Sequence, residues 1–251
     1  MFNRPLHHQP FSLPEGFTLP EQPAEPFENV YHTPGEAAAI RFFEPSSEED
    51  LQAMREILKG KQSRKWMDDP HMSQSDYRDW AGTESDTSFL FAVLDARSTD
   101  PEEIRHVEGF IYIYSEREEK FRVRRMERQG YLAPASKPRY ALEVSFAVRP
   151  RTDGSQSGSG LMSSSLRQCC LQVQMLLKSP DRAATVLFAF VHPDNFPAQR
   201  TLESSGFLKQ GSMLYDWDSP DATLLYLLDW PTLEAKVRDK VLRSIQPQEG
   251  G

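Results

Sequence analysis

The residues with the clearest chemical potential lie at positions 140–148, where a carboxylate and a hydroxyl interrupt an apolar pattern. An alternation of period two places Glu143 and Ser145 on the opposite face of a strand from the aliphatic side chains. A carboxylate in the middle of a strand is costly to bury unless it has a partner or a task. Glu143 is therefore either a rim or salt-bridge residue, or a general base that takes a proton from a substrate.

A turn rich in glycine and serine follows this strand and opens an amphipathic helix near position 161. Glycine permits positive φ and close backbone approach, and serine adds hydroxyl donors. A Gly/Ser run alone is typical of a flexible loop. At the start of a helix, however, such a turn presents N–H groups to an anion, usually a phosphate. The pattern favours a nucleotide-bearing cofactor. The buried face of the helix is predicted to be Met162, Leu166, Cys169, Val173 and Leu176.

A second apolar strand, at positions 185–191, leads into the segment HPDNFPAQRTLESSGF. Asn195 is predicted to cap a short helix at its start, and Gly206 to end it. Arg200 on this helix has two interpretations, an exposed surface charge or a contact to phosphate.

These two segments together resemble the signature of the GNAT (Gcn5-related N-acetyltransferase) superfamily. The family's pyrophosphate loop, Arg/Gln-x-x-Gly-x-Gly/Ala, is matched by Ser155-x-x-Gly158-x-Gly160, with Ser155 in place of Arg or Gln and Gln156 beside it. The family's Asn-x-x-Ala-x-Arg-x-Leu-Glu-x-x-Gly-Phe segment is matched by Asn195, Ala198, Arg200, Leu202, Glu203, Gly206 and Phe207.

The resemblance implies acetyl-CoA as co-substrate. It also implies an α/β fold with a mixed, mostly antiparallel sheet flanked by helices, and a parallel strand pair splayed at the cofactor site. Cofactor contacts are implied for the strand end, the glycine turn and the short helix. These residues are Phe146, Ala147, Val148, Ser155, Gln156, Ser157, Gly158, Ser159, Gly160, Leu161, Asn195, Ala198 and Arg200.

The reaction implied by the resemblance is transfer of an acetyl group to a primary amine, with Glu143 as the base, directly or through water. Many family members carry a tyrosine acid at the position of Leu202, so the leaving thiolate would be protonated by Ser145, Tyr215 or water. Leucine at this position resembles the branch that acetylates N-termini of ribosomal proteins. Two rivals stay open: transfer of another acyl or aminoacyl group, and a CoA-binding sensor or interaction domain without turnover.

Composition limits the classes of function. The chain has 251 residues, of which 38% are hydrophobic, and a net charge of −8 that argues against general affinity for nucleic acid. No run approaches the roughly 18 apolar residues that span a bilayer. The two cysteines, Cys169 and Cys170, are adjacent and cannot join distant segments. We expect a reduced, cytoplasmic protein with no membrane partner, acting as a monomer or homodimer.

Residues 1–37 hold seven of the nineteen prolines and are expected to form an extended or disordered tail. Residues 38–251 are expected to form one acyltransferase domain. Strands are predicted at 39–44, 88–95, 107–114, 208–217 and 222–230, with helices from Ser46 or Ser47, over 73–80 and from Pro231. The basic stretch 120–139 is either a solvated hairpin or loop, or a rim that meets an acidic substrate or the cofactor's phosphates.

Overall fold

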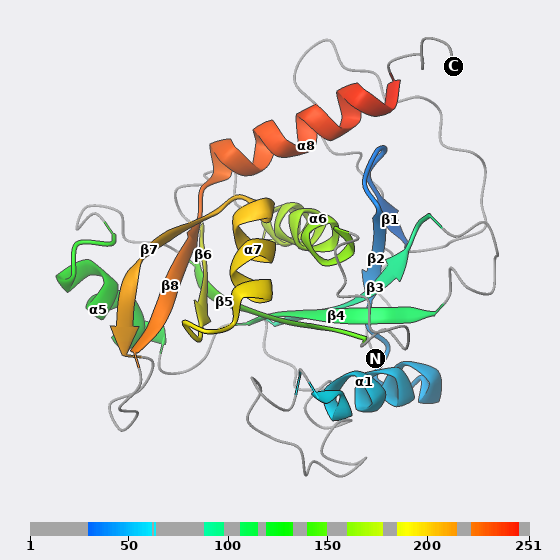
Figure 1. Cartoon of the computed structure of the whole chain (residues 1–251), viewed down its shortest axis with the longest axis horizontal. Helices are drawn as coiled ribbons and strands as arrows, with labels where there is room; N and C mark the ends of the chain where they lie inside the picture. Colours follow the sequence, from blue (N-terminus) through cyan, green and yellow to red (C-terminus); the bar gives the residue numbers. More distant parts are fainter. Residues whose placement is uncertain are drawn as a thin grey trace.

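The computed structural model describes residues 30–61, 63, 88–97, 106–114, 119–132, 140–149, 160–177, 185–214 and 222–245. These residues form one mixed sheet with helices on both faces (Figure 1). The strands are β1 Tyr31–His32, β2 Ala38–Phe42, β3 Phe89–Asp95, β4 Val107–Tyr114, β5 Tyr140–Val148, β6 Thr185–Val191, β7 Phe207–Leu214 and β8 Ala222–Leu228. The helices are α1 Glu48–Lys59, α5 Glu119–Arg128, α6 Leu161–Leu176, α7 Phe196–Ser205 and α8 Trp230–Ile245.

The strand order is β1-β2-β3-β4-β5-β6-β8-β7. Every neighbouring pair is antiparallel except β5 and β6, which are parallel and joined through α6. A parallel pair requires a crossover connection of this kind. The mixed, mostly antiparallel sheet with one parallel pair confirms the predicted fold class.

One face of the sheet, called the α6 face below, is covered by α6, α7 and α8. Leu166 of α6, Leu202 of α7 and Leu233 of α8 pack in one cluster with Leu142 and Val144 of β5. The spacing of apolar residues along α6 and α8 produces this burial, since positions three and four apart share a helix face. As predicted, Met162, Leu166, Cys169 and Val173 are buried, and Leu176 packs against the cluster half-buried.

The opposite face, called the α1–α5 face, carries two separate helices. Leu51, Met54 and Ile57 of α1 pack over β2, β3 and β4. Ser47 starts α1 as predicted, because its side chain accepts a hydrogen bond from the N–H of Asp50. Met126 of α5 packs instead over β5, β6 and β8.

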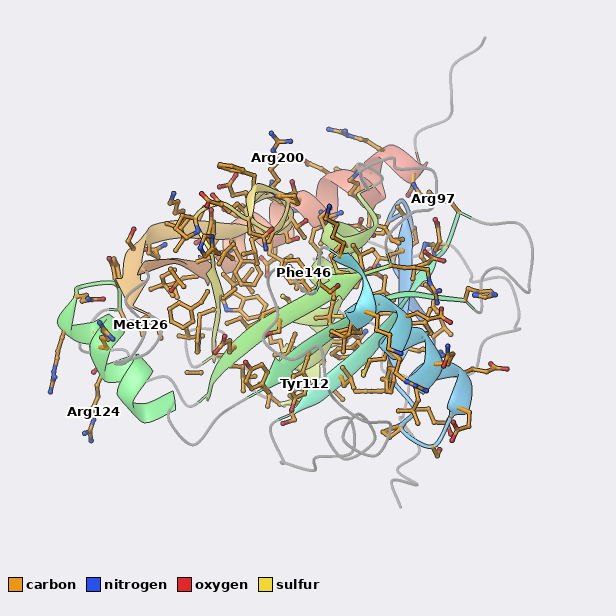
Figure 2. The ribbon with its side chains drawn as sticks, turned by 60° about the horizontal axis from the view of Figure 1, so that its bottom comes forward. Arg97, Tyr112, Arg124, Met126, Phe146 and Arg200 are labelled. Atoms are coloured by element: carbon orange, nitrogen blue, oxygen red, sulfur yellow. The ribbon has the colours of Figure 1, made fainter. Side chains whose placement is uncertain are left out.

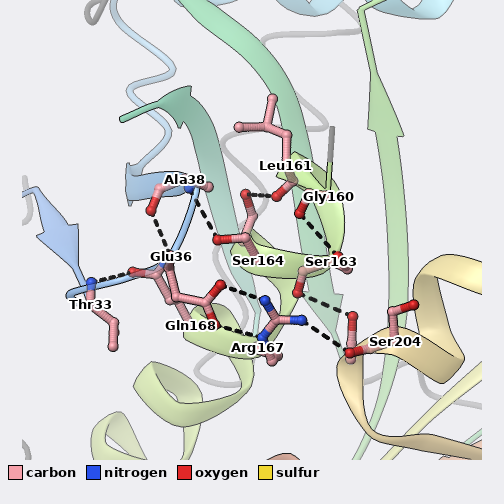
Figure 3. Close-up of polar contacts among 12 residues, drawn as sticks. Thr33, Glu36, Ala38, Gly160, Leu161, Ser163, Ser164, Arg167, Gln168 and Ser204 are labelled. Atoms are coloured by element: carbon pink, nitrogen blue, oxygen red, sulfur yellow. Dashed lines mark hydrogen bonds and ion pairs between the residues drawn. The ribbon is translucent and has the colours of Figure 1, made fainter. Parts of the chain in front are cut away.

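Residues 1–29 of the predicted tail lie outside the described residues, and residues 30–37 differ from the prediction of an unpacked tail. Tyr31 and His32 pair with β2, and Glu36 is buried against α6. Figure 3 shows the contacts that fasten this segment: the side chain of Gln168 accepts from the N–H of Thr33 at 2.9 Å and donates to the carbonyl of Ala38 at 2.7 Å. These partners lie more than a hundred residues apart in the sequence, so a local composition argument misses them.

Two other expectations have different outcomes. The hairpin or loop predicted for the basic stretch is wrong for Lys120–Arg128, which lies in the helix α5. Its burial of Met126 supplies the tertiary packing that stabilises a helix with such high charge. The helix predicted over 73–80 lies outside the described residues. Among the residues that the structure describes, no helix is both long and apolar enough to cross a membrane.

Candidate functional site

The parallel strands β5 and β6 separate part-way along their length. Their pairing runs from Tyr140 opposite Thr185 to Glu143 opposite Phe188 and then ends. Beyond Glu143, β5 continues to Val148 paired only with β4, and β6 continues to Val191 paired only with β8. A gap therefore opens between two strands that begin as neighbours, and Glu143 stands at its apex.

The register of β5 with β4 determines which backbone groups line this gap. The N–H of Arg149 donates to the carbonyl of Glu108 at 2.7 Å, and Val148 lies opposite Gly109. Because alternate residues of an antiparallel strand direct their N–H groups to opposite edges, Phe146 and Val148 direct theirs to the open edge. Ala147 directs its N–H to β4. Two of the three strand residues predicted to contact a cofactor thus present donors along the gap.

Glu143 and Ser145 lie on the α1–α5 face of β5. Glu143 is only 5% exposed and stands opposite Tyr114 of β4, while Ser145 is half-buried and stands opposite Tyr112. The rings of Tyr112 and Tyr114 stack with centroids 4.6 Å apart (Tyr112 is labelled in Figure 2). Side chains directly opposite across two strands share a face, so the carboxylate and the hydroxyl border an aromatic surface.

These two tyrosines are not among the site residues predicted from the sequence. The signal that identifies them is the alternation in VEGFIYIY, which places Tyr112 and Tyr114 on one face. The alternation does not give the register between β4 and β5, and it is this register that places Tyr114 opposite Glu143.

The two helices of the α1–α5 face leave the middle of β5 between them. Ala147 packs with the cluster under α1, and Ala141 with the cluster under α5. Glu143 and Ser145 are the residues of the same face between these two alanines. Glu143 thus lies on this face between α1 and α5, at the apex of the gap.

The start of α6 fits the prediction of an anion-binding turn. Gly160 precedes the helix in the left-handed conformation with φ of 70°, and no side chain caps the helix. A Cβ on Gly160 would meet nothing closer than the Ser163 hydroxyl at 3.9 Å, so the backbone angle and not crowding favours glycine. The first turn contains no acidic residue, and its N–H groups lack intrahelical acceptors. Residues 155–159 of the predicted cradle lie outside the described residues.

The start of α7 confirms the predicted cap. The Asn195 side-chain oxygen accepts from the N–H of Ala198 at 3.3 Å, and Gly206 ends the helix with φ of 100°. Arg200 is exposed and points away from the body of the molecule in Figure 2. Leu202 is fully buried in the α6-face cluster, so its side chain belongs to the core. Tyr215, a candidate acid, lies outside the described residues.

Comparison with known proteins identifies the fold of this chain. No protein-family model and no curated protein sequence matches this chain. A GNAT-family acetyltransferase from Bacillus anthracis superposes with a TM-score of 0.52 at 15% identity, covering 79% of this chain and 95% of the other. RimJ from Mycobacterium smegmatis, in complex with CoA-disulfide, gives 0.54 at 14% identity, covering 86% and 91%. The aminoglycoside acetyltransferase AAC(6')-Ib, solved with paromomycin and acetyl-CoA, gives 0.52 at 15% identity, covering 79% and 97%. This chain has the GNAT fold.

One polar group inside this GNAT fold was not predicted from the sequence. Tyr226 of β8 is fully buried under α7, and its hydroxyl donates to the carboxylate of Glu203 at 3.2 Å. Burial first, then the charge of Glu203 and the hydrogen bond to it, raise the pKa of Tyr226 to about 12. The phenol therefore stays protonated at neutral pH.

The part of the chain that the structure describes holds no cluster of side chains able to bind a metal ion.

Proposed function

We propose that this protein transfers an acetyl group from acetyl-CoA to a primary amine. The observation that carries the proposal is the gap between β5 and β6, with the buried carboxylate of Glu143 at its apex and backbone donors along its edge. The same sheet superposes on acetyltransferases that were solved with acetyl-CoA or with a CoA derivative, which supports the choice of co-substrate.

The residues divide into those that would hold the co-substrate and those that would act on the amine. The N–H groups of Phe146 and Val148 are suited to the pantetheine arm and the thioester carbonyl. The start of α6 at Gly160 and Leu161, with the cradle of Ser155, Gln156, Ser157, Gly158 and Ser159 before it, is suited to the pyrophosphate. The Asn195 amide N–H groups are not used by the cap and are suited to the pantetheine, beside Ala198. Arg200 is suited to the phosphates.

The proposed reaction is a direct transfer. Glu143 removes a proton from the ammonium or amine, directly or through water, and the nitrogen lone pair forms a bond to the thioester carbonyl carbon. Negative charge develops on the carbonyl oxygen, where a strand N–H stabilises it. The carbon–sulfur bond then breaks, and the electron pair leaves with the thiolate. Ser145, Tyr215 or water supplies the proton of the thiolate, and the nitrogen loses its second proton to water, so that a neutral amide forms. Leu202 has no proton to donate.

The acceptor class is proposed as a protein N-terminus, a lysine or a small-molecule amine. Leu202 favours the first, through the likeness to the branch that acetylates N-termini of ribosomal proteins. Ser155 and Leu202 also favour a second candidate function, a CoA-binding sensor or interaction domain without turnover. Transfer of a longer acyl group is the third outcome to test.

The test has two stages. Calorimetry with acetyl-CoA measures binding, and a thiol-release assay then measures turnover over N-terminal peptides, lysine peptides, polyamines and aminoglycosides. Micromolar binding with thiol release for one acceptor class supports the proposal. Absence of acetyl-CoA binding contradicts the proposal. Binding without turnover across the panel identifies a CoA-binding sensor or interaction domain. Faster turnover with longer acyl-CoA donors shows that the transferred group is a longer acyl group and not acetyl.

A further inference from the structure

A cavity of about 420 Å³ lies on the α6 face, apart from the gap between β5 and β6. It is bounded by α8, by the turn between β1 and β2, and by the first turn of α6. In Figure 1, α8 runs above α6 toward the top of β1. The segments that resemble the GNAT signature end at Phe207, so α8 is a feature that this signature does not describe.

The α8 wall of the cavity is cationic. Lys236, Lys240 and Arg243 line it, and their spacing of four and three residues places them on one side of the helix. Their side chains form no ion pair with another residue in the part of the chain that the structure describes. Like charges at this spacing destabilise a helix, so an anion in the cavity would relieve their repulsion.

The acids around the cavity do not neutralise this wall. Glu36 is buried and is already paired with Arg167, since its two carboxylate oxygens accept from Nε and Nη2 of that arginine. The remaining acid is Asp239 of α8. Three cations against one carboxylate leave two positive charges facing the cavity, which matches a phosphate monoester, whose charge at neutral pH is about −2.

The floor of the cavity adds directed donors. Arg167 is buried, and its Nη1 donates to the carbonyl of Ser204 at 3.0 Å (Figure 3). Each terminal nitrogen of a guanidinium carries a second N–H, and neither second N–H of Arg167 is used in a hydrogen bond among the described residues. Ser163, on the first turn of α6, also lines the cavity, and its hydroxyl already donates to the carbonyl of Gly160 at 3.0 Å. A phosphate monoester has three terminal oxygens and can therefore accept from these N–H groups and from the cationic wall at once.

The walls are held at a fixed distance. Gly35, in the turn between β1 and β2, has φ of 79°, and a Cβ there would clash with the carbonyl oxygen of Lys240 and lie 3.1 Å from Cβ of Ser244. The turn and α8 are thus in backbone contact. A site with fixed walls loses little entropy when it binds a ligand.

We propose that this cavity binds a phosphate monoester through Lys240, Arg243 and Lys236, with Arg167 at its floor. Two sources share this chemistry. One is the 3′-phosphate of CoA, a source that rests on the proposed function because the cavity adjoins the start of α6. The other is a separate phosphorylated metabolite.

The experiment is calorimetry on the full chain with acetyl-CoA, 3′-dephospho-acetyl-CoA and inorganic phosphate, each against wild type, K240Q and R243Q. The matched control is R238Q, which removes an exposed cation of the same helix outside the cavity. Loss of one charge-assisted contact corresponds to about tenfold weaker binding.

If the source is CoA, K240Q and R243Q bind acetyl-CoA about tenfold more weakly, dephospho-acetyl-CoA binds all variants alike, and R238Q equals wild type. If the source is another metabolite, acetyl-CoA binding is unchanged and only inorganic phosphate loses affinity in K240Q and R243Q. The proposal is overturned if all three ligands bind K240Q, R243Q and wild type equally, or if R238Q weakens binding as much as R243Q. Failure of acetyl-CoA to bind wild type contradicts the proposed function alone, because the phosphate arm still tests the cavity.

Discussion

The two faces of the sheet are built by different means. On the α6 face, side chains of α6 bond to a segment more than a hundred residues away, through Gln168 to Thr33 and through Arg167 to Glu36. On the α1–α5 face, two separate helices leave Glu143 between them. The long-range contacts that hold the fold together thus lie on the α6 face, and the proposed catalytic base lies on the other. Substitutions in the buried contacts of the α6 face are expected to change stability, and substitutions beside Glu143 to change turnover. Substitutions in the cationic wall of the cavity, which also lies on the α6 face, are expected to change binding.

The largest effect is expected for E143Q on the α1–α5 face. Glutamine keeps the size of the side chain and removes the basic oxygen, so turnover at neutral pH should fall by about 10²- to 10⁴-fold. Because the proposed cofactor contacts are backbone groups of β5 and the start of α6, acetyl-CoA affinity should stay within about threefold of wild type. Thiol release and calorimetry measure the two quantities.

The control is E108Q on β4, a substitution of the same type that lies outside the gap and should retain wild-type turnover. Equal losses of turnover and acetyl-CoA affinity in E143Q would remove Glu143 from the role of base. They would also break the division between the faces, because the carboxylate would then be a support of the fold.

The next effect is expected for R167M on the α6 face. The side chains of Arg167 and Glu36 are 6% and 1% exposed, and removing one partner of a buried pair leaves the other charge without compensation. The free energy of unfolding should fall by about 3–5 kcal/mol, measured by urea denaturation. The double variant E36Q/R167M should recover part of this loss because no buried charge remains. R238M, on the surface of α8, is the control, and a loss as large in R238M would show that the pair contributes nothing of its own.

The same division explains what the sequence could predict. The alternation around Glu143 and the glycine turn before α6 are local patterns, so the strand, the helix and the cap at Asn195 were all predicted and are confirmed. The pairing of Glu36 with Arg167 is not local, and the prolines near it predicted a tail instead. For α5, charge favoured a loop, while the burial of Met126 decides for a helix. Contacts between distant segments override local propensity at both places.

An intermediate effect is expected for G206A, where α7 ends on the α6 face. A Cβ at Gly206 would lie 2.9 Å from the backbone nitrogen of Leu233 and 3.0 Å from its Cα, and φ is 100°. Both the backbone angle and the contact with α8 oppose alanine, and the free energy of unfolding should fall by about 2–4 kcal/mol.

Gly130, at the end of α5 beside the other face, provides the matched control. Its φ is 77°, but a Cβ there would meet nothing within 4 Å. G130A should therefore lose only the contribution of the backbone angle, about 1–2 kcal/mol. Equal losses in G206A and G130A would show that the close approach of α7 to α8 has no energetic consequence.

The smallest effect is expected in the alkaline stability of the α6 face. The pKa of Tyr226 is raised from 10.0 to about 12, first by burial and then by the charge of Glu203 and the hydrogen bond to it. Between pH 10 and about 12 the unfolded chain has lost this proton while the folded chain keeps it. The unfolded state binds fewer protons, so the free energy of unfolding falls as pH rises through this window. The contribution of the raised pKa is fully present below pH 10.

Y226F removes this titration and should flatten the alkaline limb of a urea-denaturation series, while its difference from wild type stays constant from about pH 6 to pH 9. E203Q is the graded variant: it removes the charge but keeps the burial, which is the largest cause of the shift. Its alkaline slope should lie between those of wild type and Y226F. If the free energy of unfolding falls with pH as steeply in Y226F as in wild type, the buried phenol does not titrate with unfolding. The loss of stability at alkaline pH then comes from another group.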